Sequence, residues 1–253
     1  RLIDSAPSAQ AASALKREVM PSEEEDSVSP EETADPLGEA RYLVTPHLVH
    51  QYANRVLLLT TGTCVGYCRY CFRGSYMARC EGFIGQDELE EICSYLELTP
   101  AVQEILVSGG DPLSGTDDEL RTLLVRIRAS RPDILIRLCT RAPVYAPELF
   151  TDDLVAYLKS MRPLWVIPHI NHPAELGADQ ADCLRRIIDS GISIQSQTVL
   201  LRGVNDSPAL LADLFHRLVM LGVKPGYLFQ CDLAKGTSDF RVPLEQSLGI
   251  WKA

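Results

Sequence analysis

The sequence predicts an α/β fold, an incomplete (β/α)6 barrel of the TIM type, and three observations support this. Short apolar, β-prone runs alternate with segments of helical periodicity along most of the chain. The 253 residues suit one barrel-sized domain. The polar and glycine-containing groups follow the apolar runs, and in parallel folds the active residues lie at the C-terminal ends of the strands. An open doubly wound sheet is the alternative that the same alternation allows.

Six strands are expected, and helices connect most of them. The strands run from Arg55 to Thr61, Glu104 to Ser108, Ile134 to Thr140, Leu164 to Ile170, Ile192 to Leu200 and Val223 to Gln230. The helices are expected at 88–98, 117–130, 151–160, 175–190 and 207–221. Gly191 and Gly222 are expected to end the last two. Such alternation implies parallel strands with right-handed crossovers.

Residues 1–40 differ in composition from the barrel domain that is expected over 41–253. A short helix is expected within Ala9 to Arg17, followed by an acidic, proline-containing stretch to Pro36. We expect this segment to be a solvated, exposed arm. An acidic docking segment is the functional alternative.

Composition excludes several classes of protein. The net charge of −10 and the pI of about 5.0 argue against a general nucleic-acid binder. No apolar run reaches the roughly 18 residues of a membrane helix, and no signal peptide is visible. Because the chain begins with Arg1, we expect its N-terminus to be incomplete or processed. Five scattered cysteines are mostly expected in the core: Cys80, Cys93, Cys139, Cys183 and Cys231.

The other three cysteines form a C-x3-C-x2-C loop directly after the first strand. Thiolates are the usual ligands of iron–sulfur clusters, so Cys64, Cys68 and Cys71 are predicted to hold one. Three ligands leave one iron of a [4Fe–4S] cluster open, as a catalytic metal site requires. A cytoplasmic protein is expected because the oxygen-sensitive iron–sulfur chemistry that the cysteines predict needs a reducing compartment. A structural zinc site is the alternative, with Cys80 as the nearest fourth ligand.

The cysteine loop, with Tyr70 before its last cysteine, resembles that of radical S-adenosylmethionine (SAM) enzymes. The resemblance implies that the amino acid end of SAM chelates the open iron. Gly109 and Gly110 follow the second strand, where glycine lets backbone approach a ligand closely. By the same resemblance, the stretch from Ser108 to Asp111 is expected to hold the amino group of SAM.

From about Asp35 to Pro243 the chain resembles the lysine 2,3-aminomutase family. The matching stretches are Asp35-Pro-Leu-Gly-Glu39, Tyr52 with Arg55-Val-Leu-Leu-Leu, the cysteine loop, Ser108-Gly-Gly-Asp-Pro-Leu113, Thr140-Arg-Ala-Pro-Val144, His169-Ile-Asn-His-Pro173, Gln197-Thr-Val-Leu-Leu-Arg-Gly-Val-Asn-Asp206, and Gln230-Cys-Asp-Leu233 with Phe240-Arg241.

The family resemblance implies an activity and its cofactors. The activity would be the shift of the α-amino group of L-lysine to the β-carbon, through a 5′-deoxyadenosyl radical and an imine of pyridoxal 5′-phosphate (PLP). The cofactors would be the [4Fe–4S] cluster, SAM and PLP. The expected partners are an amino acid substrate, an electron donor of the flavodoxin or ferredoxin type and further copies of the chain, with no nucleic acid or membrane.

Residue roles follow from the same resemblance. Arg73 matches the arginine that pairs with the substrate carboxylate, and a bidentate pair of this kind is strong and oriented. Asp232 matches an acidic residue that holds the ε-ammonium group of lysine, which argues against glutamate as substrate. The remaining cofactor-binding positions, expected near PLP or SAM, are Tyr52, Arg55, Asn171, His172 and Gln197.

The resemblance fails at two places that concern PLP. Gln51 stands where members carry an arginine for the PLP phosphate. The glycine-rich stretch with the PLP lysine is not in this chain, which ends at Ala253, so no catalytic residue is assigned. We expect a fragment of a longer protein; a PLP-free or catalytically silent radical SAM protein is the alternative, as is an aminomutase for another amino acid. Ser207 replaces a zinc-binding cysteine of some members, so that zinc is not expected.

Overall fold

The structure is a computed structural model that describes residues 2–77 and 82–253, and its strands form one sheet in sequence order. The parallel part comprises β3 (Arg55–Leu59), β4 (Glu104–Ser108), β5 (Leu135–Thr140), β6 (Leu164–Pro168), β7 (Ser193–Leu200) and β8 (Lys224–Gln230). All six correspond to predicted strands. Two antiparallel strands that were not predicted, β1 (Leu43–Thr45) and β2 (Leu48–Tyr52), extend the sheet beyond β3.

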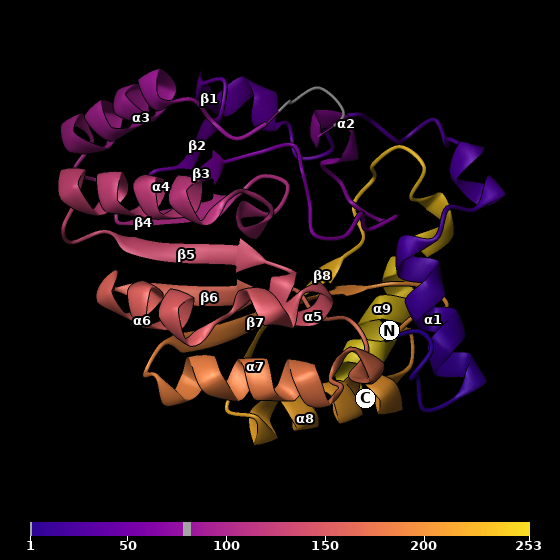
Figure 1. Cartoon of the computed structure of the whole chain (residues 1–253). Helices are drawn as coiled ribbons and strands as arrows, with labels where there is room; N and C mark the ends of the chain where they lie inside the picture. The colour runs from indigo at the N-terminus through magenta and orange to yellow at the C-terminus, as the bar shows by residue number, and fades with distance from the viewer. Residues whose placement is uncertain (1, 78–81) are drawn as a thin grey trace.

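The strand order distinguishes the incomplete barrel from the doubly wound alternative. From β3 to β8 every connection steps to the next position in the same direction. Right-handed crossovers that all step one way place their helices on one face of the sheet, whereas a doubly wound sheet needs a reversal. Figure 1 shows α3, α4, α6 and α7 following one another on the same side of the strands. The predicted incomplete barrel is therefore confirmed.

The five helices predicted between the strands are all present, and two of them begin at a side chain that caps them. The five are α3 (Gln86–Leu98), α4 (Asp117–Ser130), α6 (Asp152–Ser160), α7 (Ala178–Asp189) and α8 (Pro208–Met220). Thr116 and Glu119 form a capping box at the start of α4, and the Thr151 side chain caps α6. Three further helices were not predicted: α2 (Gly74–Met77), α5 (Ala142–Tyr145) and α9 (Leu244–Lys252).

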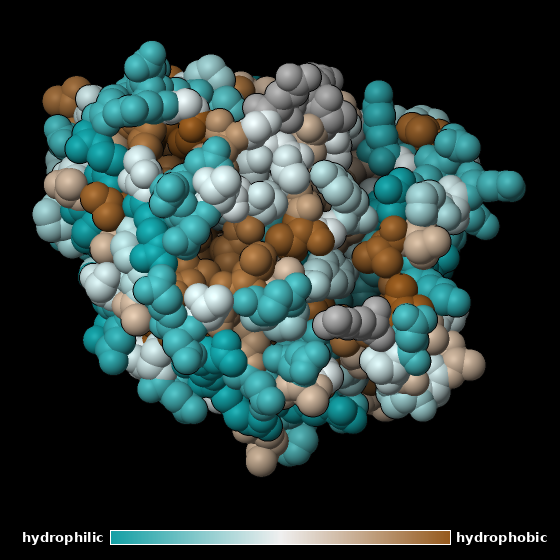
Figure 2. Space-filling model, in the orientation of Figure 1, coloured by the Kyte–Doolittle hydropathy of each residue, from teal (hydrophilic) through white to brown (hydrophobic). Residues whose placement is uncertain are grey.

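The core lies between the parallel strands and the helices that cover them. Strand residues that face the helices, such as Leu58, Ile105 and Ile136, pack with helix residues such as Leu123 in one hydrophobic cluster. The outer helical face in Figure 2 is mostly hydrophilic. Among the scattered cysteines, the buried ones are Cys93, Cys183 and Cys231, whereas Cys139 lines a cavity and Cys80 lies outside the described residues.

The N-terminal segment is only in part the exposed arm that its composition predicted, since most of 20–40 is exposed but helix α1 (Ala9–Val19) is packed. This helix buries a stripe of residues at helical spacing, comprising Ala11, Ala14, Leu15 and Glu18. Further along, the buried carboxylate of Glu32 pairs with Arg241 at 3.0 Å. The acidic 3-10 turn Glu23–Asp26 has no buried residue, and Glu32 is the one buried residue within 20–40. The helical spacing of the buried residues in α1 is present in the sequence, but the acidic stretch that follows α1 favoured the prediction of an exposed segment.

In the described part of the chain, no helix is long and apolar enough to cross a membrane.

Candidate active site

A cavity of about 490 Å³ opens at the C-terminal ends of the parallel strands. It gathers most of the residues that the sequence predicted for the site. Those that line it are Tyr52, Arg55, Cys64, Cys68, Tyr70, Cys71, Arg73, Ser108, Gly109, Gly110, Asp111, Gln197 and Asp232. This is the position that the barrel prediction assigned to an active site.

The three cysteines of the loop are free thiols that face this cavity. Burial, with the neighbouring thiols as a further cause, raises the pKa of Cys71 to about 11 and raises that of Cys64 still further. Thiols that disfavour one another's ionisation become thiolates when a cation compensates their charge, as bound iron does. Among the described residues no side-chain group could hold a single metal ion. Cluster ligands bind separate irons, so three thiols around one cavity fit a [4Fe–4S] cluster.

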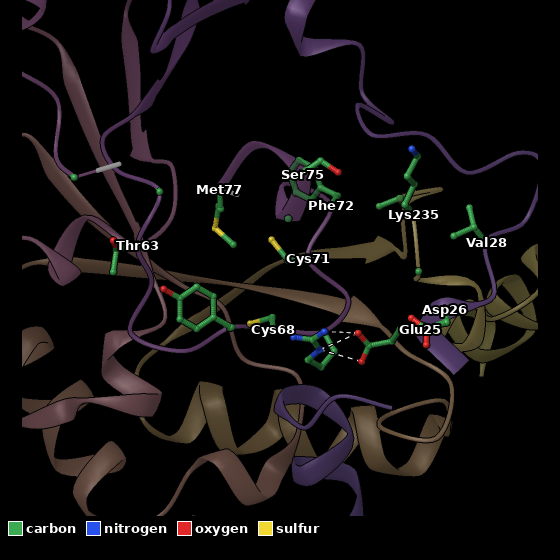
Figure 3. Close-up of a pocket in the computed structure, with 17 residues that line it drawn as sticks. Glu25, Asp26, Val28, Thr63, Cys68, Cys71, Phe72, Ser75, Met77 and Lys235 are labelled. Carbon is green, nitrogen blue, oxygen red and sulfur yellow. Dashed lines mark hydrogen bonds and ion pairs between the residues drawn. The ribbon is translucent and has the colours of Figure 1, made fainter. Parts of the chain in front are cut away.

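A second cavity, of about 850 Å³, lies on the other side of the cysteine loop. Cys68, Cys71 and Met77 line both cavities, so the loop forms a wall between them. Figure 3 shows Cys68 and Cys71 near the middle of the residues that line this second cavity, with Lys235 to their right. A group held by these cysteines would therefore be reached from two sides.

The glycines after β4 serve a close approach of backbone to backbone. Gly109 has a φ of +113°, and a Cβ there would lie 2.7 Å from the backbone nitrogen of Thr60. The Gly110 nitrogen donates to the Thr61 carbonyl at 2.6 Å. Close approach to a ligand was expected here, whereas the backbone of the two glycines lies against the segment that follows β3. The two glycines also line the cavity, where a ligand could reach them. Their role in binding SAM stays a prediction.

Asp111 fixes two neighbouring strand ends instead of pointing freely at the cavity. Its carboxylate accepts hydrogen bonds from the Thr140 hydroxyl at 2.8 and 2.9 Å and from the backbone nitrogen of Arg141 at 2.7 Å. Burial raises the pKa of Asp111 to about 6. The aspartate thus joins the end of β4 to the end of β5.

A buried polar network that the sequence did not reveal surrounds Arg141. Its guanidinium donates to Cys68 Sγ at 3.0 Å and to Glu18 Oε2 at 3.2 Å, and it also bonds the Tyr70 hydroxyl and Glu175. The backbone nitrogen of Arg69, next to Cys68, donates to the Glu18 carbonyl at 2.8 Å. Helix α1 is therefore bonded directly to the cysteine loop.

Asn171 and His172 lie outside the cavity, and His169 lines it instead. Asn171 is fully buried; its Nδ2 donates to Glu18 at 2.8 Å, and its Oδ1 accepts from the Val199 nitrogen at 2.9 Å. His172 Nδ1 accepts from the Ala174 nitrogen at 3.0 Å and so caps a short helix. Both act as supports here, and their proposed contact with SAM stays a prediction.

His169 is a neutral imidazole in this network. Its Nε2 lies 3.0 Å from Asn171 Oδ1, an atom that only accepts, so Nε2 carries the hydrogen. Burial, together with the charge of Arg141, lowers the pKa of His169 to about 3. The ring therefore keeps Nδ1 as an acceptor at neutral pH.

Arg73 and Asp232, the predicted substrate ligands, line the same cavity, and Arg73 already has a partner. Glu39 binds it with two hydrogen bonds of 2.6 and 3.0 Å, and Phe72 packs under its guanidinium at 4.3 Å. Burial raises the pKa of Asp232, while the charge of Arg73 lowers it. Sequence reasoning did not single out Glu39, although it ends the matched Asp35–Glu39 stretch.

The side of the cavity formed by β2 and β3 carries one positively charged side chain, Arg55, that could pair with an anionic group. Arg55 stacks over the Tyr52 ring at 5.5 Å, and its buried Nε has no partner among the described residues. Because Arg55 lines the cavity, its guanidinium charge fits a phosphate such as that of PLP. Gln51 lines the same wall, and none of the described lysines lines this cavity. The described residues thus fit the PLP phosphate but supply no lysine for its aldehyde.

Comparison with known proteins agrees along most of the chain. A sequence profile of the radical SAM superfamily matches residues 58–215. The chain is 57% identical over 241 residues to a putative L-lysine 2,3-aminomutase of Treponema pallidum, covering 95% of this chain and 68% of that protein. It is 34% identical over 239 residues to the L-lysine 2,3-aminomutase of Escherichia coli, covering 94% and 69%. For the enzyme of Fusobacterium nucleatum the values are 36% over 236 residues, covering 93% and 56%.

The chain spans between about half and two thirds of the length of these curated relatives. Among solved structures, native anSMEcpe with bound AdoMet and a Cp18Cys peptide superposes with a TM-score of 0.60 at 13% identity, covering 79% of this chain and 58% of that one. SuiB of Streptococcus suis gives 0.57 at 12% identity, covering 79% and 45%. At such identities these structures support the fold alone.

Proposed function

Because this chain belongs to the radical SAM superfamily and, within it, to the lysine 2,3-aminomutase family, we propose that it acts in moving the α-amino group of L-lysine to the β-carbon. The family uses a [4Fe–4S] cluster, SAM and PLP. The observation that carries the proposal is the convergence of the cysteine loop, Arg73 and Asp232 on one cavity.

The residues of the chain bind and orient these groups. Cys64, Cys68 and Cys71 would hold the cluster, and the loop of Gly109 and Gly110 would border SAM. Arg55 would neutralise the PLP phosphate. The bound groups supply the radical chemistry that removes and returns a substrate hydrogen, while the protein supplies position and a shielded cavity. We derive no step through the PLP aldehyde, because no described lysine lines this cavity.

Arg73 and Asp232 supply opposite charges for a substrate with a carboxylate and a distant amine. A charge-assisted pair at each end would fix the length and direction of the substrate. Since Glu39 occupies Arg73, a substrate carboxylate would share or replace that contact. Asp232 disfavours glutamate, whose second carboxylate would meet a like charge.

The proposal extends to the surroundings of the enzyme. The cluster needs one electron at a time from a low-potential donor of the flavodoxin or ferredoxin type. An oxygen-sensitive cluster fits a reducing compartment such as the cytosol. Assembly into an oligomer of identical chains is part of the same proposal, on the basis of family membership alone.

The test is anaerobic conversion of lysine. The full-length protein is reconstituted with iron and sulfide, mixed with SAM, PLP, dithionite and L-lysine, and analysed for β-lysine by mass spectrometry. β-Lysine is the expected product. 5′-Deoxyadenosine without β-lysine would overturn the substrate or the role of PLP and favour a PLP-free radical SAM protein. Neither product from a fully loaded cluster would overturn the proposal.

A further inference from the structure

Arg141 contacts a predicted cluster ligand, and the proposed function gives its charge no role. It lies at the end of β5 as the N-cap residue of α5, and its side chain is only 8% exposed. Its Nη1 donates to Cys68 Sγ at 3.0 Å. A guanidinium cannot lose its proton under protein conditions, so this contact brings a permanent positive charge to the sulfur.

Two buried carboxylates hold the guanidinium in place. Glu18, from α1, accepts from Nη1 at 3.2 Å, and Glu175 accepts from Nη2. Their side chains are 1% and 0% exposed. The hydroxyl of Tyr70 bonds the guanidinium as well, and the Tyr145 ring packs at 4.3 Å from its central carbon. Contacts on several sides leave the side chain little freedom to turn away from the sulfur.

We propose that Arg141 is a positioning residue that eases reduction of the cluster through its hydrogen bond to Cys68 Sγ, and that Glu18 and Glu175 restrain this effect. The inference rests on the proposed ligation of a cluster by the cysteine loop, and it does not depend on the substrate. Reduction takes one electron from an external donor and adds one negative charge to the cluster. A nearby positive charge and a hydrogen bond to a ligand sulfur both favour that added charge.

The environment strengthens this electrostatic effect. The guanidinium is out of water, where charges interact more strongly than at the surface. The two carboxylates oppose it, because each places negative charge near the same sulfur. Removing the arginine and removing a carboxylate must therefore shift the reduction potential in opposite directions. A purely structural role for the network predicts no such opposition.

The test is a reduction titration of the reconstituted protein, followed by the electron paramagnetic resonance signal of the reduced cluster. Arg141→Lys keeps the positive charge but loses the planar guanidinium, which bonds several partners at once. It should lower the ratio of reduced to oxidised cluster, measured at a fixed potential, on the order of tenfold. Glu18→Gln should raise that ratio. Arg131→Lys is the matched control, since Arg131 is a buried arginine that bonds the carbonyls of Leu96 and Val102. It should leave the ratio unchanged.

The outcomes separate this inference from the proposed function. If the unaltered protein binds no cluster, the proposed function fails first. If all variants bind a cluster and titrate like the unaltered protein, or if the two substitutions shift the potential in the same direction, the role of Arg141 is overturned. If Arg141→Lys takes up too little iron to titrate, Glu18→Gln and Glu175→Gln decide, because an upward shift is expected from both.

Discussion

The backbone of Gly110 lies so close to Thr63 that a Cβ at position 110 would sit 2.0 Å from the Thr63 carbonyl oxygen. The Asp111 nitrogen donates to that same oxygen at 2.8 Å. The loop after β4 is thereby joined to the residues that lead directly into Cys64. Packing between these two loops fixes the start of the cysteine loop.

Gly110→Ala should therefore destabilise the fold and impair the cysteine loop together. The clash is with backbone, which cannot turn aside as a side chain can, so a loss of about 2–3 kcal/mol is expected. Urea denaturation and iron content after reconstitution measure the two effects. Gly249→Ala in α9 is the control, because a Cβ there meets nothing within 4 Å. Normal iron uptake by Gly110→Ala would show that the loop tolerates the displacement.

Serine at any one of Cys64, Cys68 and Cys71 should abolish the cluster, because a hydroxyl is a poor replacement for a thiolate on iron. Visible absorbance and the iron-to-protein ratio after anaerobic reconstitution measure the loss. Cys183→Ser is the control, since Cys183 is buried in the core on α7. A variant of the loop that keeps a full cluster would remove that cysteine from the ligand set.

His169 should make the folded protein sensitive to acid. Because its folded pKa of about 3 lies below the ordinary value of 6.5, it contributes stability above pH 6.5 that is lost progressively as the pH falls towards 3. At pH 5 this amounts to about 2 kcal/mol. Urea denaturation of the cluster-free protein at pH 7 and pH 5 measures the loss.

His169→Gln lacks this titration and is compared with the unaltered protein. Asp111 and Glu175, whose pKa values are raised by burial, titrate in both proteins and so cancel in the comparison. The variant should lose less stability between pH 7 and pH 5. Equal losses in the two proteins would show that His169 is not held neutral.

Asp232→Asn should weaken lysine binding more than it slows turnover. Loss of one charge-assisted hydrogen bond to the substrate ammonium should raise the KM for lysine about tenfold or more. The control is Asp213→Asn on α8, where the exposed carboxylate pairs with Arg217 four residues on. An unchanged KM in Asp232→Asn would assign the ammonium site to another residue.

Elements with a local signal could be predicted from the sequence. Apolar runs such as Glu104 to Ser108 indicate a strand, and the acidic residues Asp117 and Asp118 after Thr116 indicate the start of a helix. The strand β2 escaped notice because its buried residues Leu48 and Val49 precede an exposed end, which breaks the alternation. Short helices such as α5 carry too few residues for a period to show.

The site could be predicted where a motif is contiguous, and not where distant residues meet. Cys64, Cys68 and Cys71 lie within one loop, so their spacing alone predicted them as cluster ligands. Glu18 and Arg141 are 123 residues apart, and only the packing of α1 brings them together. A glutamate on the buried face of an amphipathic helix was the available signal, since a buried carboxylate requires a partner.

The most direct test of the account uses L-lysine deuterated at its β-carbon. The reconstituted protein is incubated anaerobically with this substrate, SAM, PLP and dithionite, and the recovered SAM is analysed by mass spectrometry. The account predicts that deuterium appears at the 5′ carbon of the adenosyl group in the unaltered protein and is absent when Cys68 is replaced by serine. Unlabelled SAM and unlabelled 5′-deoxyadenosine from a protein with a full, reduced cluster would contradict it.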